Sequence, residues 1–127
     1  MLSPDAIVEE FLSQWSRSYL RDVMPEPELV ANGLLVELSS IGVYGTHQGQ
    51  GYASHALRML TALCDANAMT IMLVASPLES DLLPGCPAML KTKLLVAWYQ
   101  RHGFVETGGA GDGTREMIRR PKNMALK

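Results

Sequence analysis

A glycine-rich segment, residues 43–53, carries the clearest chemical signal in the sequence. Three glycines, Gly45, Gly49 and Gly51, fall within seven residues, and the segment joins a predicted strand to a predicted helix. The first backbone N–H groups of a helix have no acceptor inside the helix and lie at the positive end of its dipole. Such a helix start can bind a phosphate, and glycine at 51 lets the backbone approach a ligand because no Cβ intervenes.

Other chemistries fit this segment less well. An ordinary glycine-rich loop remains the simple alternative, because a short glycine pattern alone is a weak signal. A Walker loop is excluded because no Gly-Lys-Ser/Thr follows, and the spacing of a dinucleotide fingerprint is absent. The second glycine-rich stretch, residues 108–113, precedes no predicted helix and indicates a hairpin loop. The three histidines lack the spacing of a metal site, so we expect no metal.

The pattern of apolar residues predicts the elements that hold this segment. Ser3 and Pro4 open a helix that ends near Arg21, and Asn32-Gly33 predicts a type I′ turn between two strands. The elements are then a helix to Arg21, strands 29–31 and 34–43, a helix 52–67, a strand 70–75 that we expect to be buried on both faces, a helix 88–102, and strands 104–107 and 114–119. This order predicts a mixed α/β fold with helices packed on a central sheet.

Composition limits the classes of function. Hydrophobic residues make up 47% and charged residues 19% of the 127 residues, which predicts a single packed domain, 1–127. The formal net charge of -2 gives no broad electrostatic surface for nucleic acid or an anionic membrane. Cys64 and Cys86 have no partner at metal or redox spacing. We therefore expect a cytoplasmic protein with reduced thiols, whose acidic N-terminus does not resemble an export signal.

Four pieces of the sequence, taken in order, resemble the GNAT superfamily of acetyltransferases. Gln48-x-x-Gly51-x-Ala53 resembles its Gln/Arg-x-x-Gly-x-Gly/Ala motif, and residues 41–43 precede it as the central strand does. The apolar strand 70–75 follows the helix, and residues 97–104 resemble the late Tyr-Glu-Lys-x-Gly-Phe signature. The resemblance covers about two thirds of the chain and implies a GNAT-like central mixed sheet, flanked by helices, with a reduced N-terminal part.

The resemblance implies an acetyl-CoA-dependent N-acetyltransferase that moves the acetyl group directly to a primary amine. Main-chain groups of Ile41 and Val43 would pair with the pantetheine arm, and the Val43 amide would stabilise the oxyanion. The cofactor pyrophosphate would be bound by the turn that consists of Gln48, Gly49, Gln50, Gly51, Tyr52 and Ala53.

Two side chains would do proton transfer according to the resemblance. Glu37 lies six residues before Val43, the spacing at which some members carry a base glutamate, although a bulge at Gly42 would shift the strand's phase. A solvent-facing strand residue is the equally weighted alternative. Tyr99 matches the tyrosine that protonates the leaving thiolate, and the alternative for this residue is an aromatic ring packed between helix and sheet. Trp98 and Phe104 are interpreted as core.

The chain departs from the family in its N-terminal part, where one helix and one short strand replace about two strands and two helices. Those elements usually form a wall of the acceptor site for a small-molecule or peptide amine, so a partner subunit, such as a second copy in a homodimer, is expected to complete the sheet or the cleft. The shortened part also favours an alternative function, a non-catalytic acyl-CoA-binding sensor or partner subunit. A nucleotide-binding protein is disfavoured, because no lysine or magnesium-binding hydroxyl is suitably placed.

Overall fold

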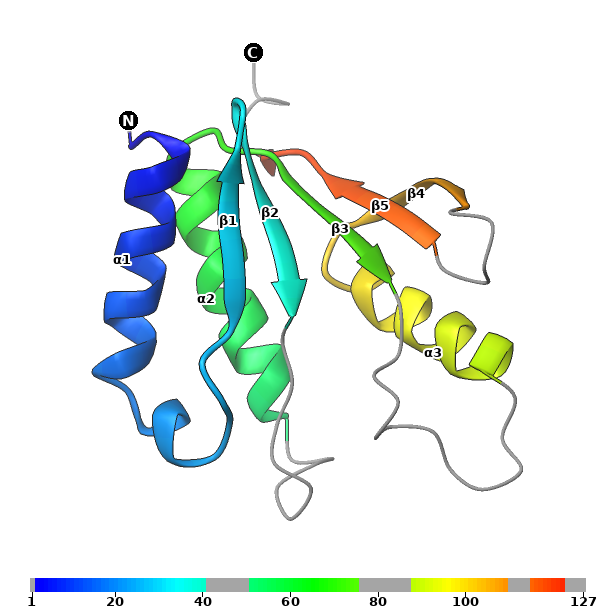
Figure 1. Ribbon diagram of the computed structural model, residues 1–127, viewed down its shortest axis with the longest axis horizontal. Helices are drawn as coiled ribbons and strands as arrows, with labels where there is room; N and C mark the ends of the chain where they lie inside the picture. The colour runs from blue at the N-terminus through cyan, green and yellow to red at the C-terminus, as the bar shows by residue number, and fades with distance from the viewer. Residues whose placement is uncertain (1, 41–50, 76–87, 110–114, 123–127) are drawn as a thin grey trace. The chain divides into compact units, whose positions relative to one another are not determined.

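The computed structural model describes residues 2–40, 51–75, 88–109 and 115–122 (Figure 1). The elements are α1 (Pro4–Ser16), the 3-10 helix η1 (Tyr19–Asp22), β1 (Glu28–Asn32), β2 (Leu35–Ser40), α2 (Tyr52–Ala66), β3 (Ile71–Ala75), α3 (Ala88–Gln100), β4 (Val105–Gly109) and β5 (Arg115–Arg119). The order of helices and strands predicted from the sequence is therefore confirmed, with η1 as an addition.

The strands form a five-stranded sheet in the order β1-β2-β3-β5-β4. The pairs β1–β2 and β4–β5 are antiparallel, whereas β2 is joined to its neighbour β3 through α2. A helical crossover between neighbouring strands is the connection that parallel pairing requires, so the sheet is mixed, as predicted. By its contacts the chain divides into two compact units, Met1–Ile71 with Arg120–Lys127, and Met72–Arg119.

The first helix begins as the sequence predicts and ends earlier. The Ser3 side chain accepts a hydrogen bond from the Ala6 N–H at 3.2 Å, and Pro4 occupies the first turn. The prediction that α1 continues to about Arg21 is wrong, because the helix ends at Ser16. There the Ser18 hydroxyl donates to the Trp15 carbonyl at 2.8 Å and its oxygen accepts from the Leu20 N–H at 3.1 Å. These bonds close α1 and start η1, since serine competes with helical bonding in this way.

The turn between β1 and β2 lies one residue later than the predicted Asn-Gly turn. Asn32 pairs with Leu35 across the hairpin, so the two turn residues are Gly33 and Leu34. Only the first of them has a positive φ, +64° at Gly33, which is the pattern of a type II′ turn rather than type I′. The Leu34 side chain is 92% exposed at the tip.

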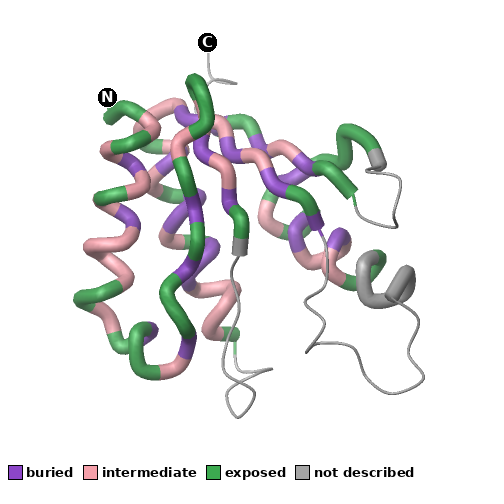
Figure 2. Tube along the Cα trace, viewed as in Figure 1, coloured by how far each residue is buried: buried purple, intermediate pink, exposed green. Residues whose placement is uncertain are grey.

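The core of the first unit is formed by one face of the hairpin and the helices beside it. Val36 and Leu38 of β2 are buried and alternate with Glu37, which faces the other way. Helix α1 packs against β1, β2 and α2, and its buried, half-buried and exposed faces can be followed in Figure 2. The helices contribute the buried side chains Ile7, Phe11, Ala56, Leu57, Leu60 and Cys64. Cys64 therefore belongs to this core.

The burial of β3 differs from the prediction made from the sequence. The prediction that the strand over residues 70–75 is buried on both faces is wrong, because Val74 is 47% exposed while Leu73 and Ala75 are buried. Its continuous apolar run therefore reflects β-propensity as well as burial. In the second unit, Phe104 and Met117 are buried. β4 and β5 pair as antiparallel strands, and the prediction that Gly108 and Gly109 belong to a loop is wrong, because both pair with β5.

Candidate functional site

The structure describes part of the site predicted from the sequence. Gly51, Tyr52, Ala53 and Glu37 belong to the first unit, and Tyr99 belongs to the second. The remaining predicted residues lie outside the described ranges, so their roles stay predictions: Ile41, Val43, Gln48, Gly49 and Gln50.

The residue before α2 is a glycine with a left-handed backbone. Gly51 is the residue before the helix and has φ 82° and ψ 8°, the left-handed region in which a side chain is strained. A Cβ built there would meet no atom of the described residues within 4 Å. The first helical bond runs from the His55 N–H to the Gly51 carbonyl at 2.9 Å, and the first turn carries no acidic residue. A positive helix end with open space beside its glycine suits an anion.

An aromatic cluster at this helix start was not found from the sequence. Tyr19 of η1 and His55 of α2 are joined by a 2.8 Å hydrogen bond between the Tyr19 hydroxyl and His55 Nδ1. The Tyr52 ring stands edge-on to Tyr19, with 5.8 Å between ring centroids. Because 36 residues separate Tyr19 from His55, no local spacing signals this contact. The hydrogen bond ties η1 to the first turn of α2.

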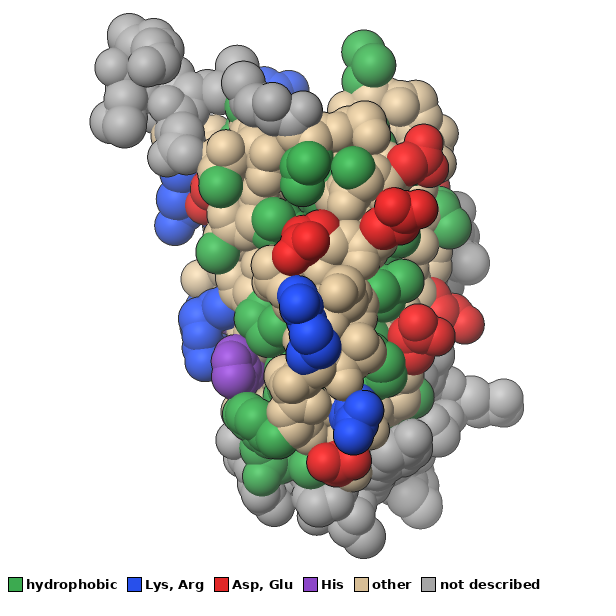
Figure 3. Space-filling model, turned by 90° about the vertical axis from the view of Figure 1, so that its left-hand side faces the viewer, with side chains coloured by type: hydrophobic (Ala, Val, Ile, Leu, Met, Phe, Trp, Pro, Cys, Tyr) green, Lys and Arg blue, Asp and Glu red, His purple; other side chains and the backbone are tan. Residues whose placement is uncertain are grey.

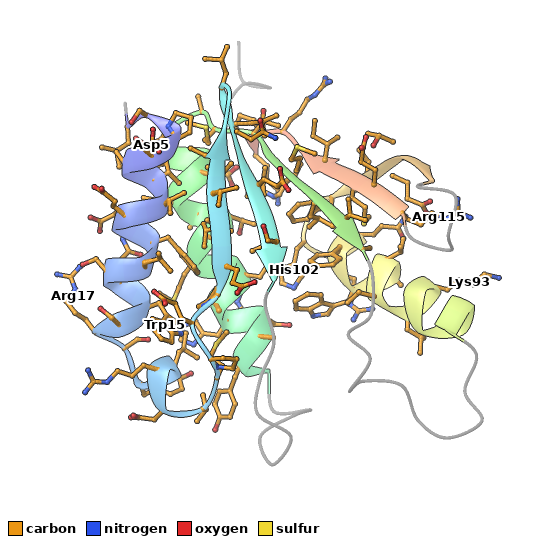
Figure 4. All side chains as sticks on the ribbon, in the orientation of Figure 1. Asp5, Trp15, Arg17, Lys93, His102 and Arg115 are labelled. Atoms are coloured by element: carbon orange, nitrogen blue, oxygen red, sulfur yellow. The ribbon has the colours of Figure 1, made fainter. Side chains whose placement is uncertain are left out.

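A small apolar cluster supports the same contact. Trp15, labelled in Figure 4, packs there from α1, and its indole N–H is buried without a hydrogen-bond partner among the described residues. The cluster consists of Leu20, Met24 and Ala56, with Trp15, Val23, Tyr52 and Met59 packed against them. The short N-terminal part of the chain thus packs directly against the helix start that is predicted to bind the cofactor.

Glu37 is a half-buried residue on the face of β2 opposite the core. It stands across from Val30 of β1, which is 51% exposed. The Asn32 side-chain amide donates to Glu37 Oε1 at 3.0 Å, so one carboxylate oxygen is held by the end of the hairpin. The structure therefore places Glu37 on an accessible strand face, which both interpretations of this residue allow.

The last turn of α3 explains the late signature in local physical terms. The Phe104 N–H donates to the Tyr99 carbonyl at 3.3 Å, and the Gly103 N–H donates to the Gln100 carbonyl at 3.0 Å. Gly103 has φ +94°, so these bonds form a Schellman motif, the common helix ending that uses a left-handed glycine. The aromatic contact that accompanies it joins Tyr99 to Phe104, with centroids 5.5 Å apart.

This ending buries the Tyr99 ring. The side chain is 7% exposed and lies between Phe104 and Trp98, whose ring centroid is 4.9 Å away. Burial raises the pKa of Tyr99 to about 12 because a phenolate there would lose its hydration. At neutral pH the hydroxyl therefore keeps its proton and can act as a donor. Phe104 is buried as predicted, whereas Trp98 is only half-buried.

The surface formed by α1 carries both signs of charge. Acidic and basic side chains lie side by side on this face (Figure 3), and Arg17 lies 3.9 Å from Glu10. Such exposed ion pairs contribute little to stability. Within the described ranges, no helix is long and apolar enough to cross a membrane. The same residues contain no group of His, Cys, Asp or Glu side chains that could hold a metal ion.

Comparisons with known proteins bear on the fold. The sequence matches no protein-family model and no curated protein. The structure is similar to that of Ard1 from Thermoplasma volcanium, with a TM-score of 0.51 and 16% identity over 94% of each chain. It also matches nourseothricin acetyltransferase, with a TM-score of 0.49 and 16% identity. That match covers 74% of this chain and 55% of the length of nourseothricin acetyltransferase. Because the similarity to Ard1 covers nearly the whole chain, it includes the N-terminal part.

Proposed function

On the premise that the chain has the GNAT acetyltransferase fold, we propose that it is an acetyl-CoA-dependent N-acetyltransferase. The acceptor in this proposal is a primary amine, which receives the acetyl group directly. One observation carries the proposal, namely the left-handed Gly51 at the start of α2, where a Cβ would meet no atom of the described residues within 4 Å. A diphosphate needs such a helix start, where amides point outward and no Cβ blocks their approach.

The residues at this start fit the cofactor chemically. The first turn of α2 contains no acidic side chain that would repel a diphosphate. Residues 48–53 would supply backbone amides, and Ile41 and Val43 would hold the pantetheine arm. The thioester of acetyl-CoA supplies an activated acetyl carbon when it is bound. The chain's own task is then to orient that carbon toward an amine and to move two protons.

Glu37 is the proposed base. A primary amine is protonated at neutral pH and must lose a proton before it can attack a carbonyl carbon. The half-buried carboxylate can accept that proton directly or through water, while Asn32 holds one of its oxygens. As the C–N bond forms and the C–S bond breaks, the amine's second proton also leaves, and a proton returns to the sulfur.

Tyr99 is the proposed donor to the sulfur. A thiol has a pKa of about 8.5, and the Tyr99 hydroxyl has a pKa of about 12. Complete transfer of the Tyr99 proton to the thiolate would therefore be unfavourable, because the pKa of the phenol is more than three pKa units above that of the thiol. We infer that Tyr99 mainly donates a hydrogen bond as negative charge develops on the sulfur, and that any proton it gives is replaced from water.

The decisive experiment measures coenzyme A binding by calorimetry for two matched variants. Gly51→Glu places a negative side chain at the proposed diphosphate site, and we expect affinity to fall by about 100-fold or more. Gly33→Glu is the control, because Gly33 also has a positive φ and open space around it, +64° in the β1–β2 turn. Unchanged affinity in Gly51→Glu, or equal losses in both variants, would show that the cofactor does not bind at this turn.

The alternative function, a non-catalytic acyl-CoA sensor or partner subunit, makes a different prediction. Such a protein binds acetyl-CoA without releasing coenzyme A thiol when amines are added. A thiol-release assay with a panel of small amines and amine-bearing peptides therefore separates the two functions. Light scattering on the same sample measures the molar mass and so tests whether the chain forms the homodimer that is proposed to complete the acceptor site.

A further inference from the structure

A buried arginine lies behind the end of α3. The Arg119 side chain of β5 is only 3% exposed, and its Nε donates to the His102 carbonyl at 2.8 Å. A guanidinium group loses hydration when it is buried, and that cost is offset only where hydrogen bonds replace the water. The end of a helix is a favourable place for it, because the last carbonyls carry the negative end of the dipole.

The carbonyl that Arg119 binds is one that the helix ending does not use. In the Schellman motif the amides of Gly103 and Phe104 serve the carbonyls of Gln100 and Tyr99. The His102 carbonyl lies between these bonds, and Arg119 takes it. A Cβ at Gly103 would lie 3.1 Å from Arg119 Nε, so glycine here permits both the left-handed turn and the approach of the guanidinium.

The same ending fixes the ring of Tyr99. The Tyr99 carbonyl accepts hydrogen bonds from both His102 and Phe104, and the rings of Tyr99 and Phe104 stand edge to face. On the other side, the His102 ring, labelled in Figure 4, is 5.3 Å from that of Trp98, which in turn contacts Tyr99. Trp98 and Phe104 therefore contact the Tyr99 ring directly, and Arg119 binds the backbone carbonyl of His102, two residues before Phe104.

We propose that Arg119 is a positioning residue for the transfer reaction, which holds the end of α3 so that the Tyr99 hydroxyl stands in its working place. This inference rests on the proposed function, because it assumes that Tyr99 donates to the sulfur. Arg119 acts through the His102 carbonyl and the Schellman motif, without itself touching a substrate. If Arg119 were only structural, it would stabilise the second unit, and its substitution would lower kcat by the same factor with tyrosine or phenylalanine at position 99.

A kinetic cycle tests the coupling. Arg119→Met is expected to lower kcat about 10-fold, with the KM for acetyl-CoA within about twofold. In a Tyr99→Phe background, which itself should lower kcat with little change in coenzyme A affinity, the same substitution should change kcat by less than about twofold. The control is Arg120→Met, an exposed arginine next in the chain. Equal losses in both backgrounds, or an effect on KM alone, would overturn the inference.

A second measurement does not depend on activity. NMR spectra of protein labelled with ring-¹³C tyrosine report the chemical shifts of the Tyr99 ring, which are assigned by their loss in Tyr99→Phe. Arg119→Met should move these chemical shifts at least halfway to random-coil values. Arg119→Lys, which keeps the cation and loses Nε, should move them in the same direction. Unmoved resonances with a lowered Tm would make Arg119 structural only. Moved resonances in a protein without transferase activity would instead refute the proposed function.

Discussion

The buried hydroxyl of Tyr99 makes stability depend on pH in the alkaline range. The side chain is 7% exposed, and its pKa is raised from 10.0 to about 12 by burial. The perturbation is the substitution Tyr99→Phe, which removes the titrating group and keeps the ring that packs between Trp98 and Phe104. Comparing the two proteins isolates Tyr99 from every other group that titrates at high pH.

The sign follows from proton binding in the two states. Below about pH 10 both the folded and the unfolded chain hold the phenol proton, so the contribution of the raised pKa is fully present. Between about pH 10 and 12 the unfolded chain loses the proton while the folded chain keeps it, and stability falls as pH rises. A shift of about two units corresponds to about 2.7 kcal/mol in total, of which about 2 kcal/mol is lost by roughly pH 11.5.

Urea unfolding at a series of pH values measures this effect. The free energy of unfolding of the wild type should fall relative to Tyr99→Phe by about 2 kcal/mol between roughly pH 8 and 11.5. Below about pH 9 the difference between the two proteins should be constant, since neither state of the wild type has begun to lose the proton. A difference that stays constant up to pH 11.5 would refute the burial of the hydroxyl and, with it, the reason for assigning Tyr99 the role of hydrogen-bond donor.

Two further substitutions test the site. Glu37→Gln, which keeps the oxygen that accepts from Asn32, should lower kcat by about 100-fold if Glu37 is the base. Glu28→Gln, at an exposed residue of β1, should leave kcat unchanged; equal kcat values for the wild type and Glu37→Gln would make Glu37 a solvent-facing residue. Gly103→Ala should cost about 2 kcal/mol of unfolding free energy through backbone strain and crowding of Arg119. The control is Gly108→Ala, because a Cβ at this position meets no described atom within 4 Å. If both variants lose the same unfolding free energy, position 103 has no special requirement for glycine.

The sequence predicted the elements because their signals are local. Ser3 and Pro4 mark the start of α1 through the bonds of a single helical turn. Gly51 and Gly103 mark a helix start and a helix end, and both have positive φ, which the Schellman ending requires at Gly103. The spacing from Tyr99 to Phe104 is the spacing of a Schellman motif, so this part of the candidate site was also visible in the sequence.

The features that the sequence did not predict depend either on side chains that compete for backbone hydrogen bonds or on contacts between residues far apart in the sequence. Helix α1 ends early because serine hydroxyls compete for its carbonyls, and apolar periodicity does not report that competition. The hydrogen bond of Tyr19 with His55 joins residues far apart in the sequence, and Arg119 reaches a carbonyl 17 residues away. Neither contact has a spacing rule. The burial of the Arg119 guanidinium also has no signal in the sequence, because arginine is usually exposed.

The helix ending at Tyr99 has a consequence for how this domain can change over time. Its main-chain hydrogen bonds join residues within five positions of one another, whereas the bond from Arg119 to the His102 carbonyl spans 17 positions. Contacts of low sequence separation form quickly during folding, so the helix can end at Gly103 before β5 brings Arg119 to it. Substitutions elsewhere can therefore accumulate as long as Arg119 is kept, and a graft of residues 99–104 onto the end of another helix should reproduce the turn but not the fixed direction of the Tyr99 hydroxyl.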